Sequence, residues 1–555
     1  MSILRQSQLA AGVMAALLSA CGGGGGGSAP VTPSLTLTGT AATGAAIAGA
    51  PVQVKCASGT GSATSAADGR YTVEIAAGSL PCALTVQPAG GSALHSVIEG
   101  SGPGTVTVNI SPLTELVVAR LAGGTPADLV ASFDSAAQAK VTRSRLDAAI
   151  VDVAAALQGT IDLAGVDPLK DALAVGNALD QKLDALNAAL AAARTSLADV
   201  AAALAAGGDA SASVGTMLQP AAANCAGLRS GRYAWLSPVE NDPSAPGYAF
   251  VTIDAAVLTV GYRDGAGVDH SAMLTDDGSC TYSGPVDAQG SSKFLVSSSG
   301  ITIKRDTDSS GPQAGLTFVG GILVPLQAIP LAELAGTWNV MKYYRETVTT
   351  AFAAGRATMV VDGAGKLTAL TGCDSAGMCQ ERSIGNNGDG FTANADGGFD
   401  IGGSATEASS RAFAYKAADG SLSMFMKYSG GRGFMILAKQ AALPLPDPGT
   451  VSNYWDVSFT SSGSSPTLVE QSTTVTAVDA AAGTYTRTST SRVDRYKVDD
   501  PQAGMRSRAA NSCTTPAGAA LACSGIVAMP LPGTGITSYF TVAPQSDFGI
   551  TIARP

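Results

Sequence analysis

The side chains best suited to acid–base or nucleophilic chemistry in this sequence are two histidines, His95 and His270, and nine cysteines. A Ser-His-Asp relay would have to use one of these histidines, because the aspartate must orient an imidazole. Asp269 precedes His270, but neighbouring residues of a strand point to opposite faces of a sheet, so this pair is poorly placed. His95 lies in the apolar string ALHSVIE and is interpreted as a strand residue. We therefore predict no catalytic histidine.

Aspartates in glycine-rich strings are the next candidates. Asp306 and Asp308 in DTDSSG resemble the start of a calcium-binding loop, but the twelfth position is Thr317, where such a loop carries glutamate. Asp389 and Asp396 lie among glycines and are typical of hairpin turns. The sequence contains no G-x-S-x-G, S-x-x-K, H-E-x-x-H or P-loop pattern. We expect no enzymatic activity, no metal and no cofactor.

Eight of the nine cysteines fall into four pairs that are neighbours along the chain. An even number of cysteines in an exported protein predicts disulfides. Five residues separate the members of the third pair, more than in a usual zinc knuckle. The expected pairs are Cys56–Cys82, Cys225–Cys280, Cys373–Cys379 and Cys513–Cys523.

The ninth cysteine, Cys21, follows a short apolar segment and precedes six glycines. Residues 9–18 are apolar, and ten helical residues span about 15 Å, half of a bilayer core of about 30 Å. The segment follows a polar stretch with one positive charge, Arg5, as in a secretory signal peptide. We therefore expect residues 1–20 to be a signal peptide.

The residues Leu18-Ser19-Ala20-Cys21 resemble the lipobox of bacterial lipoproteins. This resemblance implies that the chain is cut before Cys21 and that this cysteine carries acyl chains such as palmitate. The residue after this cysteine is Gly22. In that family, the absence of aspartate at this position favours the outer membrane over the inner one. Residues 21–34 then form a flexible tether. The resemblance implies a lipid anchor in the cell outer membrane and leaves open whether the protein faces the periplasm or the surface.

The formal net charge is −10 at pH 7, which argues against nucleic acid as a partner. Charged residues make up 14% of the chain, while glycine is abundant at 67 residues. This composition is typical of an exported, β-rich protein. The length of 555 residues is enough for several domains.

Residues 35–111 contain short segments that alternate in polarity, which predicts strands. Asp68-Gly69 predicts a turn before Tyr71, which we expect to point into the core. The strings GTAATGAAIAGAPVQVKC and SATSAADGRYTVEI resemble the carboxypeptidase regulatory-like, transthyretin-like β-sandwich. The resemblance implies an accessory domain without catalytic residues. We expect Cys56 and Cys82 to join the two sheets.

Residues 112–220 change to helical periodicity. Ser111 before Pro112 and Thr125 before Pro126 are typical helix starts. Leucines recur at spacings of three, four or seven between Leu179 and Val200, which predicts the core of a small helical bundle. A coiled-coil partner site is the alternative interpretation of this stripe.

Residues 221–555 return to β periodicity in three similar units, 221–330, 331–443 and 444–555, each opening with an aromatic-rich strand. We expect about eight antiparallel strands in each unit, in a barrel or a sandwich that could enclose a small apolar cavity. Gly336-Thr337-Trp338 is similar to the G-x-W opening of lipocalin-type barrels, which implies that Trp338 packs at a barrel floor.

The sequence therefore predicts a mainly β, multidomain protein: an N-terminal β-sandwich, a small α-helical bundle and repeated antiparallel β units. The hypothesis for function is a membrane-anchored binding or interaction module of the cell envelope. Its expected partners are the membrane, through Cys21, and a protein or small apolar ligand at the β units. The alternatives are a structural or assembly factor of the outer membrane and an envelope enzyme with an unrecognised site.

Overall fold

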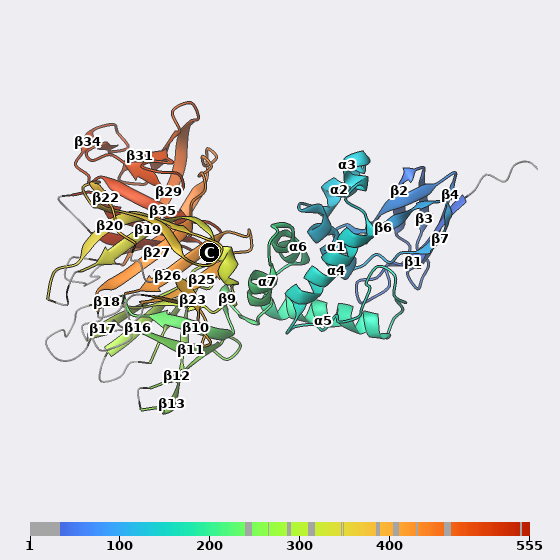
Figure 1. Cartoon of the computed structure of the whole chain (residues 1–555), viewed down its shortest axis with the longest axis horizontal. Coiled ribbons are helices and arrows are strands. Elements are labelled where there is room, and N and C mark those ends of the chain that lie inside the picture. Colours follow the sequence, from blue (N-terminus) through green and yellow to red (C-terminus); the bar gives the residue numbers. More distant parts are fainter. Residues whose placement is uncertain are drawn as a thin grey trace, which may run out of the picture.

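The computed structural model is mainly β and multidomain, as predicted. A sandwich lies at one end, the helices lie next to it, and the three β units form a second body at the other end (Figure 1). Cys21 and the expected signal peptide lie outside the described residues. The structure describes residues 34–238, 247–264, 266–285, 290–308, 317–345, 347, 349–384, 389–402, 410–428, 431–459, 468–543 and 547–554.

The N-terminal sandwich has two sheets, with strand orders β4-β1-β7 and β3-β2-β5-β6. Tyr71 is buried in its core and donates a hydrogen bond to the carbonyl of Val108. The disulfide Cys56–Cys82 joins β2 to its neighbour β5, so the expectation that it links the two sheets was wrong. These cysteines face each other across one strand pair, which brings them together without any contribution from the second sheet. The strands are β1 (Ser34–Thr40), β2 (Pro51–Ser58), β3 (Thr60–Thr64), β4 (Arg70–Ala76), β5 (Ser79–Val86), β6 (Leu94–Gly102) and β7 (Gly104–Thr107).

Seven helices follow among the described residues, and their apolar faces form one core with part of the sandwich. Ser111 and Thr125 cap the first two helices, as predicted. The leucine stripe does not continue through one helix, because Arg194 adopts a left-handed conformation and Ser196 caps a new helix. The helices are α1 (Pro112–Ala122), α2 (Pro126–Ser132), α3 (Ser135–Gln138), α4 (Arg143–Leu157), α5 (Ala178–Ala193), α6 (Leu197–Ala205) and α7 (Ser211–Met217).

Within the described ranges, no single helix is both long and apolar enough to cross a membrane. The pair α5 and α6 meets the length and composition criteria only when both helices are taken together, and it is bent by 97°.

The first β unit is an antiparallel meander whose first and last long strands, β10 and β18, pair with each other. A short hairpin of β8 and β9 precedes it. The sheet curls, and β13 and β14 are its two edges in the described part of the chain. Its strands are β8 (Ala221–Ala222), β9 (Cys225–Arg229), β10 (Gly231–Leu236), β11 (Tyr248–Asp254), β12 (Thr259–Arg263), β13 (Asp269–Met273), β14 (Thr275–Gly278), β15 (Thr281–Ser283), β16 (Gly290–Val296), β17 (Thr302–Asp308) and β18 (Thr317–Pro325).

The second β unit repeats this topology, with β19 paired to β27. Trp338 is fully buried inside the curl, and its indole N–H donates to the carbonyl of Leu334 at 2.7 Å. The elements are η2 (Leu331–Leu334), β19 (Gly336–Tyr344), β20 (Ala353–Val361), β21 (Leu367–Asp374), β22 (Cys379–Glu381), β23 (Phe391–Ala393), β24 (Phe399–Ile401), β25 (Ser410–Lys416), β26 (Leu422–Lys427) and β27 (Gly433–Lys439).

The third β unit is a closed barrel. Its first and last strands pair, and an additional pairing between β30 and β31 completes the ring. The short hairpin of β33 and β34 branches from β31 and carries the disulfide Cys513–Cys523. The strands are β28 (Val451–Phe459), β29 (Leu468–Asp479), β30 (Thr484–Thr488), β31 (Val493–Val498), β32 (Arg506–Arg508), β33 (Cys513–Thr514), β34 (Ala520–Leu521), β35 (Ile526–Leu531), β36 (Ile536–Thr541) and β37 (Phe548–Ala553).

The three β units share one apolar core, to which each contributes one face of its wall strands. Tyr343 of the second unit lies 5.4 Å from Phe459 of the third, measured between ring centroids. Phe434 and Phe548 are 5.3 Å apart across the same boundary. Because this core lies between the units, many apolar side chains of the third barrel point outward, toward the other two units.

Candidate functional site

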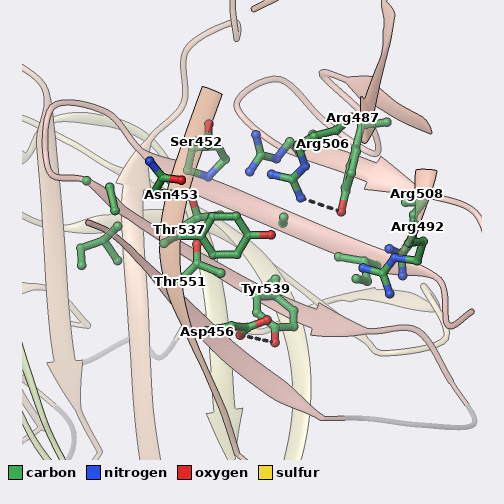
Figure 2. Close-up of a pocket in the computed structure, with 18 of the residues that line it drawn as sticks. Ser452, Asn453, Asp456, Arg487, Arg492, Arg506, Arg508, Thr537, Tyr539 and Thr551 are labelled. Carbon is green, nitrogen blue, oxygen red and sulfur yellow. Dashed lines mark hydrogen bonds between the residues drawn. The ribbon is translucent and has the colours of Figure 1, made fainter. Parts of the chain in front are cut away.

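A cavity of about 810 Å³ occupies the lumen of the third barrel (Figure 2). It extends to the end of the barrel where β28 begins and β37 ends, since Val451 and Arg554 belong to its lining. Its volume lies in the range of about 300–1,000 Å³ that is usual for small-molecule sites.

The polarity of the lumen follows from strand alternation. On β28, Trp455 and Val457 are buried in the core shared by the three units, whereas Tyr454 and Asp456 line the cavity. On β36, Phe540 faces the shared core and Tyr539 faces the cavity. Successive side chains of a strand point to opposite faces, so an apolar outer face leaves polar residues inside. The lumen is therefore polar, in contrast to the apolar cavity expected from the sequence.

Besides Arg554 at the end of the barrel, four arginines line the cavity, and two of these four are paired with one carboxylate. Arg508 Nη1 donates to Asp494 Oδ1 at 2.8 Å, and Arg492 Nε donates to Asp494 Oδ2 at 3.1 Å. Arg508 Nη2 also donates to the carbonyl of Ser524 at 2.8 Å. Asp494 and Arg508 are buried, so this cluster fixes the position of two guanidinium groups in the barrel wall.

The other two arginines, Arg487 and Arg506, have no carboxylate partner within the described part of the chain. Arg487 Nη2 donates to the hydroxyl of Tyr496 at 3.1 Å, and Arg506 Nη1 donates to the hydroxyl of Tyr485 at 2.9 Å. The Nε atoms of both arginines are buried and make no hydrogen bond to the described residues. Both side chains line the cavity, so their uncompensated positive charges attract an anion into the lumen.

Tyrosine rings hold the free arginines in place. The Tyr485 and Tyr496 rings stack with their centroids 5.6 Å apart. The Arg487 guanidinium lies over the Tyr496 ring at 4.9 Å, and that of Arg506 lies 5.5 Å from the same ring. These contacts orient the guanidinium groups before any ligand arrives, which lowers the entropy lost on binding.

Asp456 is the one acidic residue in the lining that the structure describes. The Tyr539 hydroxyl donates to Asp456 Oδ1 at 2.7 Å. To reach it, the Tyr539 ring crosses over Gly549, where an added Cβ would lie 2.2 Å from Tyr539 Cζ. Burial raises the pKa of Asp456, while this hydrogen bond and the charges of Arg487 and Arg492 act in the opposite direction.

The Asp456 carboxylate predicts a pH dependence of anion binding. As the pH falls to the raised pKa of Asp456, the carboxylate takes up a proton and the lumen loses a negative charge. We expect sulfate, which stays ionised, to bind more tightly as the pH is lowered toward the raised pKa of Asp456. Calorimetric titration at each pH measures this, and Asp456→Asn should remove most of the dependence. Equal pH slopes in the wild type and in this variant would contradict the assignment.

The sequence-predicted residues lie mostly elsewhere. The structure contains the four disulfides expected from the sequence, and Cys523 of the last one lines the cavity. His95 is buried in β6, with Nδ1 2.9 Å from Glu115 Oε2. His270 lies on β13, with Nε2 2.7 Å from Asp264 Oδ2 rather than near Asp269. Neither histidine lies in the third unit.

No group of three or more His, Cys, Asp or Glu side chains that could hold a metal occurs in the described ranges. Asp306, considered above for calcium, forms an ion pair with Lys304 and accepts a hydrogen bond from Ser292. Asp396 lies in the turn between β23 and β24, as predicted.

The second unit encloses a smaller cavity of about 410 Å³ with a different character. Val340, Met359 and Leu437 give it apolar walls, and Lys342 and Tyr344 line it further along β19. The cavities of the second and third units therefore differ in chemistry.

Sequence reasoning missed the arginines of the third barrel. Arg487, Arg492, Arg495, Arg506 and Arg508 lie within 22 residues of an acidic chain, and Arg506 and Arg508 are two positions apart. Two arginines on one face of a strand are unusual for a half-buried sheet. The spacing of two between Arg506 and Arg508 was therefore the feature of the sequence that could have indicated this site.

No family model matches the chain, and no curated protein matches it in sequence. Among solved structures, a DUF3598-family protein of unknown function from Nostoc punctiforme is 12% identical, over 41% of this chain and 98% of that one, with a TM-score of 0.14. The isotype 1 transferrin-binding protein B of serogroup B Neisseria meningitidis is 7% identical, over 55% of this chain and 65% of that one, with a TM-score of 0.19. Similarities at these scores carry no functional conclusion.

Proposed function

We propose that this protein is an exported, lipid-anchored binding protein that takes a small anionic ligand into the barrel of its third β unit. One observation carries the proposal: Arg487 and Arg506 line the lumen of a closed barrel, and no described carboxylate pairs with either of them. An anion with two or more oxygens can accept hydrogen bonds from guanidinium groups that line the lumen, and it neutralises their charge.

The export part of the proposal rests on two observations. Four disulfides indicate folding in an oxidising compartment. The lipobox-like residues before Cys21 supply a membrane anchor, which we place in the outer membrane. The sandwich, as an accessory domain of the transthyretin-like class, and the helices would then hold the β body away from the lipid.

The cavity favours binding over the other candidate functions. A purely structural role needs a packed barrel, whereas this barrel leaves about 810 Å³ open. A Ser-His-Asp relay needs an imidazole near the ligand, and both histidines lie in other parts of the fold.

Calorimetric titration of the purified full chain with sodium sulfate tests the proposal. Sodium chloride holds the ionic strength constant within each titration, and the titration is repeated at several ionic strengths. We expect saturable binding at one site per chain, with an affinity that falls as ionic strength rises, because the attraction is partly electrostatic. Heats that do not saturate at millimolar sulfate would overturn it.

A further inference from the structure

Opposite the arginines, the cavity has a second wall that is rich in hydroxyl groups. Ser452 on β28, Thr537 on β36 and Thr551 on β37 line it, and all three are labelled in Figure 2. None of these three hydroxyls has a side-chain hydrogen bond to another described residue.

The strand register places the members of this wall side by side. Thr551 lies opposite Asp456 on β28 and opposite Thr537 on β36. Directly opposed residues have Cβ atoms about 4.5–5.5 Å apart, so the three side chains form a continuous row. Asp456 Oδ1 accepts from Tyr539, and Oδ2 accepts no hydrogen bond from the described residues. The row therefore offers two hydroxyls, which donate and accept, beside a free carboxylate oxygen.

Small residues separate the two walls. Arg506 on β32 lies opposite Ala528 on β35, and Ala528 lies opposite Tyr539 on β36. Adjacent strands are about 4.8 Å apart, so the backbones of Arg506 and Tyr539 are about 10 Å apart with only a methyl group between them. One compact ligand can reach both walls across this gap.

We infer that the ligand is an acidic sugar, with its carboxylate on Arg487 and Arg506 and its ring hydroxyls on Asp456, Thr537 and Thr551. This inference rests on the proposed function and names the ligand class of the same site. A neutral sugar leaves the arginines unsatisfied, and a carboxylate without hydroxyls leaves the opposite wall unsatisfied. The Tyr485 and Tyr496 rings stack on each other, so ring stacking with an aromatic ligand contributes less than polar contacts.

Calorimetric titrations of the purified full chain with three ligands of similar ring size measure the contribution of the carboxylate and that of the ring hydroxyls separately. The ligands are D-galacturonate, D-galactose and cyclohexanecarboxylate, and we expect galacturonate to bind at least about tenfold more tightly than either of the others. A galacturonate trisaccharide distinguishes a free sugar acid from one carried on a polysaccharide. Tighter binding of the monomer indicates the free acid, and tighter binding of the trisaccharide indicates the polymer. Both results support the inference.

Thr551→Val removes one hydroxyl while keeping the shape of the side chain. We expect it to weaken galacturonate binding about fivefold and to leave cyclohexanecarboxylate binding unchanged. Thr537→Val is the second variant if the first does not fold. Thr486→Val on β30 is the matched control, because Thr486 lies between the cavity-facing residues Tyr485 and Arg487 and so points away from the lumen.

Two results would overturn the inference in different ways. If cyclohexanecarboxylate binds as tightly as galacturonate, the hydroxyl wall has no role and the ligand is a simple anion, although the proposed function stands. If neither carboxylate binds and sulfate does not bind, both the inference and the proposed function fail.

Discussion

Replacing Arg487 and Arg506 together by glutamine should weaken sulfate binding by at least about 100-fold. A hydrogen bond to a charged group contributes about 1.5–3 kcal/mol, and every 1.4 kcal/mol changes the affinity tenfold. Glutamine keeps a donor and much of the side-chain length but removes the charge. The measurement is calorimetric titration of both proteins under the same buffer conditions.

Arg495→Gln is the matched control for this pair. Arg495 lies on β31 next to the cavity-lining residue Tyr496, is itself exposed, and donates to Thr484 Oγ1 at 3.0 Å. We expect the sulfate affinity of this variant to be within about twofold of that of the wild type, because water and salt screen the charge of an exposed side chain. An equal loss of affinity in Arg495→Gln would show that the effect comes from net charge and not from the cavity.

The double variant should fold at least as stably as the wild type in sulfate-free buffer. Neither Arg487 nor Arg506 has a carboxylate partner among the described residues, so replacing both leaves no buried carboxylate unpaired. Thermal unfolding of both proteins separates this effect from binding. A large drop in unfolding temperature would mean that the arginines are structural.

Cys21→Ser should abolish attachment of the protein to membranes and incorporation of palmitate. Two or more acyl chains give stable anchoring, at about 0.8 kcal/mol for each buried CH₂, and serine cannot carry them through a thioether. The measurements are radiolabelled palmitate incorporation and the partition of the protein between membrane and soluble fractions. Normal incorporation in Cys21→Ser would contradict the assignment of the anchor.

Gly22→Asp provides a matched control for the anchor. This substitution keeps Cys21, so the protein should still take up palmitate. According to the lipoprotein resemblance, aspartate after the cysteine should retain the protein in the inner membrane. Fractionation of the two membranes detects this change, and an unchanged distribution would contradict outer-membrane sorting by this residue.

Local features of the fold were predictable because their causes are local. Ser111 and Thr125 cap helices because their hydroxyls accept from free backbone N–H groups of the first turn. The cysteine pairs were predictable because both members of each pair lie within one domain or one β unit. The break after α5 was not predictable from the leucine stripe, because Arg194 and Ser196 interrupt the helix without changing its apolar spacing.

The candidate site depends on long-range structure, which a single sequence does not reveal. Alternation on β28 divides Trp455 and Asp456 between two faces but does not say which face looks into the barrel. The outcome depends on the core shared with the first two units, whose residues are distant in sequence. The alternation therefore predicted strands correctly, whereas the expectation of an apolar lumen in the third unit was wrong.

The most direct test of the central claim is the position of a bound anion in crystals of the full chain soaked with sodium selenate, located by the anomalous scattering of selenium. We expect one peak inside the third barrel, with selenate oxygens about 2.7–2.9 Å from nitrogen atoms of Arg487 and Arg506. We also expect this peak to disappear in the double glutamine variant. Selenate bound only at exposed lysines and arginines, with an empty lumen in the wild type, would contradict the central claim.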